Sequence, residues 1–534
     1  MTTPNRLAVL GCAALVVSTA AGCASVEKVA SGGDGGGGAI TMGTTSVTST
    51  LDPAGAYDVG SWLILNNTFQ SLLTFPAGAT VAQPEAAEAC QFTSADALTY
   101  KCTLKSGLKF SNGHPLTAQD VKFSIERTKK IDDPSGPSSL LSTIKSVETA
   151  GDREITFHLE TPDAVLPAKL ASAAGAIVDH QVFPADKLLG NDKLIGSGPY
   201  KIDSVEMNGK APSKVVLSAN SGYQGNAKLE NSKFTIRYYD KPEGLKSALD
   251  NGDIDLTDNS LDPTISAQIK DDDQVGKGNL KVADGAGGDT RYLVFNTKNE
   301  TTGNPAVRQA AAQLMNRGAL AHDVYAGTVQ PLYSVVPAGV AGHNTAFFDK
   351  YGEADVAKAK RILANAHVAT PVKINLTWSR ARAGAAEGEQ LKKQLENGGL
   401  FQVTVAQEPD WTAYQAGWKN GSYQAYTVGW TPDYADADDY ISPLVVDGGA
   451  FHNGWDNPQI STKLVPDSIK LTDRSGGGAY DQIQKLLADG VPMIPLFQNK
   501  SFYVYKNGIS GVDSTVDNTG VFRLWLVGRT GTKK

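Results

Sequence analysis

The sequence predicts an α/β protein with more than one domain, and three observations carry that prediction. Over residues 354–407, amphipathic stretches that favour helices alternate with apolar stretches that favour strands, an order typical of α/β layers. The chain has 534 residues, which is too long for one simple hydrophobic core and indicates two or three domains. No low-complexity linker follows residue 38, so we expect several crossings of the chain between domains.

The N-terminal part of this fold is predicted to begin with a strand over residues 40–47, which a Leu-Asp-Pro turn at 51–53 ends. Apolar residues at helical spacing predict a helix over 62–73, and residues 88–110 have the pattern of a β-hairpin. A capping box, a Thr followed three positions later by an Asp, predicts a helix over 117–129.

Short strands dominate the middle of the chain, and helices return after it. Residues 154–160 alternate as in a half-buried strand, and the Gly-Ser-Gly-Pro-Tyr sequence at 196–200 is typical of a tight turn. Further strands are predicted at 200–205, 214–219, 234–239, 254–256, 291–296, 372–378 and 403–407, and further helices at 244–251, 306–315, 354–366 and 387–397.

A leader precedes this fold. Arg6 supplies a positive charge, residues 7–21 are apolar or small almost throughout, and Cys23 follows an Ala-Ala-Gly sequence. This pattern predicts a bacterial lipoprotein signal peptide over 1–22, cleaved before an acylated Cys23. Acyl chains such as palmitate, with the glycine-rich tether at 23–38, would hold the protein at the outer face of the cell membrane. A plain secretory signal with a chance cysteine is the alternative.

The cysteines fit an oxidising compartment. Cys12 leaves with the leader, so Cys90 and Cys102 are the pair that remains beside the lipid site. They lie on two strand-like stretches separated by a turn-rich stretch at 93–97, where facing cysteines on a hairpin could bridge. We therefore predict a disulfide, and two free thiols are the alternative.

Composition and motifs argue against several classes of function. The formal net charge of −7 and the lack of long basic runs disfavour nucleic-acid binding. No two of the seven histidines have metal-ligand spacing, no P-loop is present, and no pair of carboxylates stands out as a glycosidase couple. We therefore predict no enzyme, no metal and no cofactor, and keep a secreted hydrolase as a remote alternative.

One segment does suggest ligand binding. Residues 426–440 run from an apolar strand into a Gly-Trp pair, a proline turn, and closely spaced aspartates and tyrosines. Such a loop can present an aromatic ring and an anion to a ligand, and a carboxylate there could hold an ammonium group. Calcium binding or a solvated acidic loop are the alternatives, although the spacing does not fit an EF-hand.

Several segments together carry a resemblance to a known family. They are the stretches at 104–121 and 304–310, the Gly-Ser-Gly-Pro-Tyr turn at 196–200, the Gly-Asp-Ile-Asp sequence at 252–255, and the Gly-Trp-Thr-Pro-Asp-Tyr loop at 429–434. In this order and spacing the chain resembles the extracytoplasmic solute-binding proteins of the dipeptide, oligopeptide and nickel class of ABC importers, solute-binding protein family 5.

The resemblance implies a periplasmic-binding-protein-like clamshell of type II, with two lobes and a small third domain. Ligand would be buried between the lobes, which would close about hinges near residues 287 and 497. The implied domains are a discontinuous lobe I at 39–75, 190–287 and 497–534, a small domain at 76–189, and lobe II at 288–496.

The resemblance also implies which residues touch the ligand. In peptide-binding members an aspartate after the Gly-Trp pair holds the peptide α-amino group, and Asp433 is the matching position. Thr431 stands where some oligopeptide binders have a cysteine beside the ligand loop. The full implied set of ligand-binding residues is Asp433, Trp430, Gly429, Thr431, Tyr57, Val59, Asn259 and Tyr292.

The expected function is capture of di- or oligopeptides by a lipid-anchored, extracytoplasmic, monomeric protein that delivers them to the transmembrane subunits of an ABC permease. Binding of another solute, such as a metal chelate, a siderophore or a sugar, is the alternative on the same fold. Ligand would act by differential binding, because the closed form gains contacts from both lobes.

Overall fold

The computed structural model describes residues 38–79, 81–209, 211–261, 263–379, 385–446, 448–474 and 478–530. The predicted signal peptide, Cys23 and nearly all of the glycine-rich tether lie outside these residues. The described residues belong to one contact unit, Gly37–Lys534. None of the helices among them is long and apolar enough to cross a membrane.

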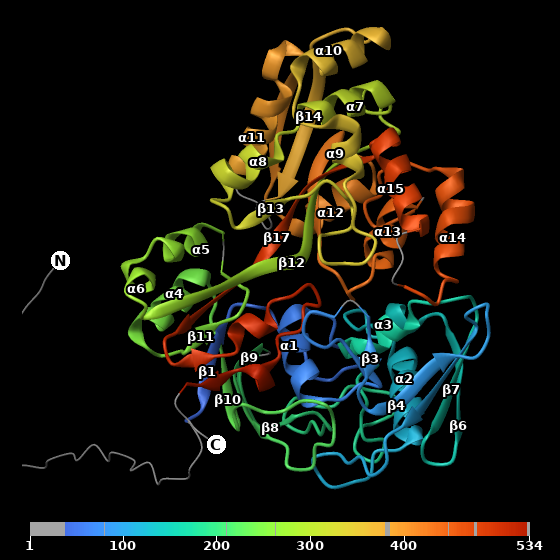
Figure 1. Ribbon diagram of the computed structural model, residues 1–534, viewed down its shortest axis with the longest axis vertical. Coiled ribbons are helices and arrows are strands. Elements are labelled where there is room, and N and C mark those ends of the chain that lie inside the picture. Colours follow the sequence, from blue (N-terminus) through green and yellow to red (C-terminus); the bar gives the residue numbers. More distant parts are fainter. Residues whose placement is uncertain are drawn as a thin grey trace, which may run out of the picture. The chain divides into compact units, whose positions relative to one another are not determined.

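Two long antiparallel strands, β12 (Leu280–Phe295) and β17 (Met493–Lys506), run side by side through an 11-stranded sheet (Figure 1). The strand order is β15-β14-β16-β12-β17-β11-β1-β10-β9-β8, and β13 pairs with β17 off this path. The other strands of this sheet are β1 (Ile40–Thr44), β8 (Tyr200–Asn208), β9 (Ala211–Ala219), β10 (Lys233–Tyr238), β11 (Leu256–Thr257), β13 (Val329–Pro331), β14 (Val372–Ser379), β15 (Phe401–Glu408) and β16 (Ala425–Trp430).

The ladder between β12 and β17 is irregular near its middle. Regular pairing stops after Ala286 and resumes at Thr290. Within this gap the side-chain amide of Gln498 donates to the carbonyl of Gly287 over 3.4 Å. Extra residues in one strand bend it and increase its local twist. The sheet is therefore continuous from end to end but locally deformed at residues 287–289.

A second, four-stranded sheet has the order β4-β5-β7-β6 and carries helix α2 (Ala118–Ile131) against β6 and β7. The predicted capping box is present, since Thr117 and Asp120 exchange hydrogen bonds at the start of α2. These strands are β4 (Ala87–Phe92), β5 (Thr99–Leu104), β6 (Ile144–Ala150) and β7 (Glu154–Leu159); β2 (Leu73–Thr74) pairs with β3 (Gln83–Pro84), and β18 (Ile509–Ser510) with β19 (Gly528–Arg529).

The predicted disulfide is confirmed. Cys90 of β4 lies directly opposite Cys102 of β5, with 4.1 Å between their Cα atoms, and the two sulfurs are bonded. Alternation along β5 buries Cys102 and Leu104 and leaves Lys101 exposed, so the bridge lies on the buried face of this strand.

Helix α1 (Val59–Thr68) ends earlier than the predicted helix over 62–73. Phe69 is extended, and the Thr68 carbonyl instead accepts a hydrogen bond from the Gly198 N–H over 2.9 Å. A Cβ atom on Gly198 would lie 2.5 Å from the carbonyl carbon of Thr68, so the Gly-Ser-Gly-Pro-Tyr turn packs directly on the end of the helix. The residues after Thr68 are apolar because they are buried and not because they are helical, since Leu72 and Leu73 are 2% and 3% exposed.

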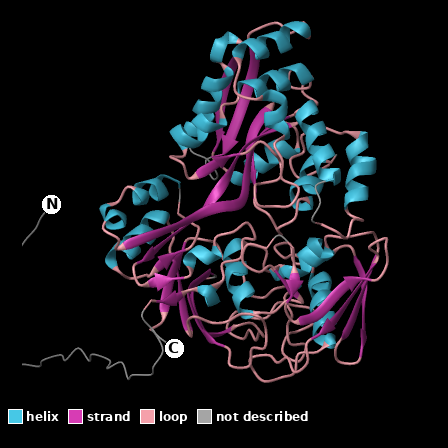
Figure 2. Cartoon of the chain, in the orientation of Figure 1, coloured by secondary structure: helices cyan, strands magenta, loops and turns pink. Residues whose placement is uncertain are grey.

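Helices surround the strands near β14, whereas the region near β8 is mostly strand and loop (Figure 2). Asn304 caps α7, where its side chain accepts from the N–H of Ala306. The other α-helices are α3 (Leu166–Ala171), α4 (Pro242–Asn251), α5 (Pro263–Lys270), α6 (Asp273–Gly276), α7 (Pro305–Leu314), α8 (Arg317–Ala319), α9 (Ala346–Tyr351), α10 (Val356–Asn365), α11 (Ala385–Leu395), α12 (Trp411–Lys419), α13 (Asp438–Val445), α14 (Val465–Ser468) and α15 (Gly478–Gly490).

The buried apolar side chains form separate clusters. One uses only residues between Tyr292 and Phe497, around β14 and β16. Another, which we call the 72–177 cluster, is built by residues of that range together with Tyr434 and Ala435. A third joins β1, β8, β9 and β10 to the C-terminal segment. The predicted lobe and domain boundaries stay predictions, although these clusters follow a similar division of the chain.

Candidate functional site

The acidic and aromatic segment begins where β16 ends. Trp430 is the last residue of β16 and lies opposite Thr290 of β12, next to the irregular part of the central ladder. The chain then turns at Pro432 and enters α13 at Asp438. We call residues 429–440 the ligand loop.

Asp433 meets Tyr57, a residue from the other end of the sequence. Burial, and then the nearby charge of Asp433, raise the pKa of Tyr57, so the two side chains lie close together; the ring of Tyr57 lies 5.7 Å from that of Trp62. Trp62 is fixed in turn, because its Nε1 donates to the Ala56 carbonyl over 2.9 Å. Tyr57 is 37% exposed, so this pair lies at a surface that solvent or a ligand can reach.

A second carboxylate supports the first. Asp439 is 2% exposed, and its Oδ2 accepts from the Asp433 N–H over 2.9 Å and from Trp430 Nε1 over 3.3 Å. These two bonds fix the turn between the indole and α13. Asp439 therefore determines where the Asp433 backbone and the Trp430 ring lie.

Neither carboxylate forms an ion pair with a basic side chain among the residues that the structure describes. Burial raises the pKa of Asp433, and the nearby Tyr57 hydroxyl partly opposes that shift. Burial raises the pKa of Asp439 as well, and the nearby charge of Asp433 raises it further. No described basic side chain contributes to either shift. A buried carboxyl group close to a half-buried one favours an incoming positive charge.

The aromatic side of the loop is also fixed. The Trp430 ring is half-buried and stands edge-on to Phe451, with 6.3 Å between centroids. Gly429 and Thr431 are exposed on either side of it. A Cβ atom on Gly429 would come within 3.0 Å of the Thr290 carbonyl, so a small residue suits this position.

Tyr440 ties the loop to the irregular segment of β12. Its buried hydroxyl donates to the Gly288 carbonyl over 2.9 Å. A Cβ atom on Gly288 would lie 2.7 Å from Pro432 Cγ and 3.1 Å from the Tyr440 hydroxyl. The ligand loop can therefore approach the central strand this closely because residue 288 is a glycine.

The loop also enters the 72–177 cluster. Tyr434 is 8% exposed and packs among the apolar residues of that cluster, and its hydroxyl lies 3.4 Å from Asp438 Oδ2. A backbone hydrogen bond of 2.7 Å from the Ala164 N–H to the carbonyl of Ile469, which follows α14, also joins the 72–177 range to a distant part of the chain. The segment beside Asp433 is thus docked on residues that lie far away in the sequence.

Two other predicted ligand-binding residues, Tyr292 and Asn259, have hydrogen-bond partners outside the ligand loop, although the Tyr292 ring contacts Phe451 beside Trp430. Tyr292 is fully buried in the core, and its hydroxyl donates to the Val335 carbonyl over 2.7 Å. Asn259 is exposed, and its Oδ1 accepts from the Phe502 N–H over 2.7 Å, which secures β17. Val59 is the first residue of α1, close in sequence to Tyr57, and 62% exposed. The structure gives Tyr292 and Asn259 structural partners.

Sequence reasoning passed over two residues that organise the loop, Asp439 and Tyr440. Both lie in the acidic and aromatic segment at 426–440, but neither was among the residues of that segment predicted to bind ligand. The signal was the dense spacing of carboxylates, two of which, Asp438 and Asp439, lie in the first turn of α13.

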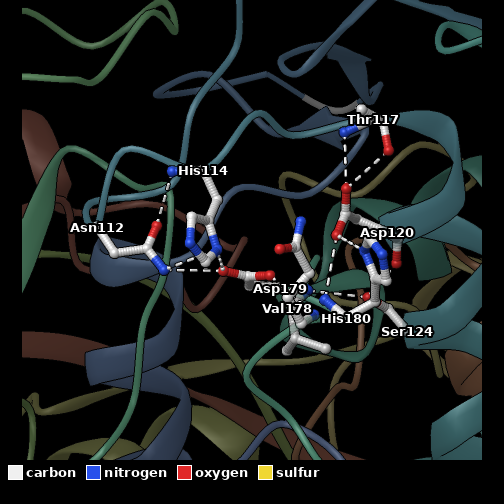
Figure 3. Close-up of polar contacts among 9 residues, drawn as sticks. Asn112, His114, Thr117, Asp120, Ser124, Val178, Asp179 and His180 are labelled. Carbon is white, nitrogen blue, oxygen red and sulfur yellow. Dashed lines mark hydrogen bonds and ion pairs between the residues drawn. The ribbon is translucent and has the colours of Figure 1, made fainter.

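One group of side chains has metal-ligand chemistry (Figure 3). Ligand atoms of Asp120, Asp179 and His180 lie within 4.8 Å of one another. Each carboxylate is already engaged, however. Asp120 accepts from Thr117 and from His180, whose Nδ1 lies 2.6 Å away, and Asp179 accepts from His114 Nδ1 over 2.8 Å. These contacts join the start of α2 to the segment at 178–180, and the group fits a structural network better than a metal site.

The described architecture is that of a two-lobed periplasmic binding protein of type II. It matches the unliganded open form of a periplasmic murein tripeptide-binding protein, MppA, with a TM-score of 0.78 at 20% identity over 92% of this chain and 98% of that one. It also matches DppA of Helicobacter pylori in complex with the peptide STSA, with a TM-score of 0.72 at 23% identity over 92% of this chain and 98% of that one.

The chain belongs to the bacterial extracellular solute-binding proteins, family 5, whose family description matches residues 81–451. It is 23% identical over 494 residues to the oligopeptide-binding protein OppA of Bacillus subtilis, covering 87% of this chain and 88% of that protein. It is 26% identical over 463 residues to the di/tripeptide-binding protein 1 of Pseudomonas aeruginosa, covering 80% of this chain and 82% of that protein. The predicted family and fold class are therefore confirmed, and these relatives are binding proteins and not enzymes.

Proposed function

We propose that this protein captures peptides and delivers them to an ABC permease, and that the ligand loop holds the peptide α-ammonium group at Asp433. The observation that carries the proposal is the pair of close carboxylates, Asp433 and Asp439, without a described basic partner. The peptide-binding relatives support the same class of ligand.

The energetics fit an ammonium anchor. A hydrogen bond between two charged groups contributes about 1.5–3 kcal/mol net, and more strongly where water is excluded. The Tyr57 hydroxyl occupies one side of Asp433 in the unliganded protein, and a ligand ammonium would add the charge that a phenol cannot supply. Trp430 would then pack against the first residues of the peptide.

Capture would involve contacts from both predicted lobes. Tyr57 precedes α1, whereas Asp433 follows β16, and these elements contribute to different buried clusters. A ligand between them would favour the arrangement in which both segments touch it. Acyl chains at Cys23 would keep the protein at the outer face of the membrane, close to its permease.

The decisive experiment is mass spectrometry of the ligand released from purified protein, followed by calorimetry with that ligand. For a peptide, we expect Asp433→Asn to weaken binding by roughly 10- to 150-fold, the range that about 1.5–3 kcal/mol predicts. N-acetylation of the peptide should weaken binding to the wild type by a similar factor. Asp271→Asn is the matched control, because Asp271 is exposed and lies outside the ligand loop.

Two outcomes would contradict the proposal. Equal affinity for free and acetylated peptides would refute the ammonium role of Asp433. Release of a metal chelate, a siderophore or a sugar, with no binding of peptides, would refute peptide capture and leave the family assignment unchanged.

A further inference from the structure

A cavity with a volume of 190 Å³ lies outside the ligand loop. The C-terminal end of α1, the segment around β2 and the C-terminal residues 521–526 form its walls. Its apolar lining includes Leu65, Phe69, Phe75 and Trp525. No residue of the ligand loop lines it, so a ligand here would occupy a different site from the proposed peptide site.

A buried carboxylate forms part of the wall. Glu85 is 8% exposed and lines the cavity. It accepts from the Tyr223 hydroxyl over 2.7 Å, from the Asn226 N–H over 3.2 Å and from Gln70 Nε2 over 3.3 Å. All three donors are neutral, and Glu85 has no ion pair with a described basic side chain.

This carboxylate is short of positive charge. An ionised carboxylate offers about four acceptor sites, and the neutral donors use three of them. A charge removed from water is normally paired with an opposite charge. Burial, and then the charge of Glu85, raises the pKa of Tyr223, so its hydroxyl stays protonated and donates. These donors leave one acceptor position of Glu85 unused, and Glu85 lines the cavity.

The cavity wall has a second polar group that could form a further hydrogen bond. Arg523 is 1% exposed and lines the cavity. Its terminal nitrogens bond to Asp517 and to the Phe75 carbonyl, each over 2.8 Å, while its Nε has no acceptor among the described residues. A hydroxyl or carbonyl oxygen on a ligand could accept from it.

We propose that this cavity binds a small amphipathic ammonium compound, with the ammonium at Glu85 and an aromatic or branched body against Phe69, Phe75 and Trp525. The size is appropriate, since an apolar cavity of about 150 Å³ holds benzene. A volume of 190 Å³ accommodates a ring with a short ammonium arm. This site is independent of the proposed peptide function.

The test uses 2-phenylethylamine as the probe and 2-phenylethanol as its neutral counterpart, with calorimetry on the purified full-length protein. We expect saturable binding of the amine, at least about tenfold tighter than that of the alcohol, because only the amine forms a charged hydrogen bond to Glu85. Glu85→Gln should abolish this preference, so that the amine and the alcohol bind with about equal affinity. Glu88→Gln is the matched control, because the Glu88 side chain is 64% exposed and pairs with Arg153.

The comparison of amine and alcohol needs no variant, so it tests the site even if Glu85→Gln fails to fold. Equal binding of the two probes by the wild type, or no saturable binding of the amine, would overturn the proposal. Loss of amine binding in Asp433→Asn would also overturn it, by placing the probe at the ligand loop. Retained amine binding in Asp433→Asn supports a separate site, whether or not that variant still binds peptides.

Discussion

Tyr434 offers a sharp test of how the ligand loop is held. Replacement by alanine removes a ring that is 8% exposed and packed in the 72–177 cluster. Truncation of a buried aromatic side chain costs about 3–5 kcal/mol. If this free energy is lost only from the state in which the ligand loop is docked on the 72–177 cluster, ligand affinity drops by a factor between about a hundred and several thousand.

Tyr434→Phe is the matched control. It keeps the ring and removes only a hydroxyl whose bond to Asp438 is long, at 3.4 Å. Because this hydrogen bond to a carboxylate is so long, we take its net contribution as about 1 kcal/mol, so affinity should change by about fivefold at most. The assay is calorimetric measurement of Kd for the ligand identified by mass spectrometry, with thermal unfolding of each variant alongside.

The reasoning fails if Tyr434→Ala binds ligand with wild-type affinity while its Tm falls. That result would mean that the ring stabilises the folded chain without positioning Asp433. A drop in affinity with Tyr434→Phe as large as that with alanine would assign the effect to the hydroxyl instead of the packing.

Three further predictions follow from charges, close contacts and the cross-link. Burial raises the pKa of Asp433 and Asp439 in the folded protein. Protonation of these two groups therefore stabilises the folded state at low pH, and this stabilisation is lost as the pH rises through the raised pKa values. Affinity for a cationic ligand should change in the opposite sense and fall on acidification between about pH 7 and pH 4, and a Kd that is constant over that range would contradict it. Gly198→Ala should lower the Tm, because its Cβ atom would lie 2.5 Å from the carbonyl carbon of Thr68 at the end of α1. Gly244→Ala is the control: its nearest neighbour would lie at 3.8 Å, so the Tm should stay unchanged or rise. Replacement of both Cys90 and Cys102 by serine should destabilise the protein by about 3 kcal/mol, since the bridge closes a loop with a sequence separation of 12, and a reductant should affect the wild type alone in calorimetry.

Local signals in the sequence predicted several elements well. The capping box predicted the start of α2, and alternation with facing cysteines predicted the β4–β5 hairpin and its bridge. These features depend on neighbours within a few residues, so a single sequence contains them. The end of α1 was predicted wrongly because its stop depends on Gly198, a residue far along the chain that packs on Thr68.

The candidate site was harder to predict for the same reason. The loop chemistry pointed to a carboxylate and the family resemblance to Asp433, but the contact of Asp433 with Tyr57 is created by folding and not by spacing. The role of Tyr292 stays a prediction from its position on the crossover strand, because the strand period does not identify the neighbours of a buried residue. In the structure its hydroxyl meets the Val335 carbonyl inside the core.

The hydrogen bonds of Asp439 have a consequence for how such a protein can change its ligand during evolution. Asp439 and Tyr440 hold the turn around Asp433 from within the protein, through Trp430 and Gly288, and so the charged anchor exists before any ligand arrives. The exposed residues beside the anchor, such as Val59 and Thr431, support none of these bonds. If Asp433 is the anchor that we propose, substitutions at those two positions would alter the choice of solute while the anchor is inherited unchanged.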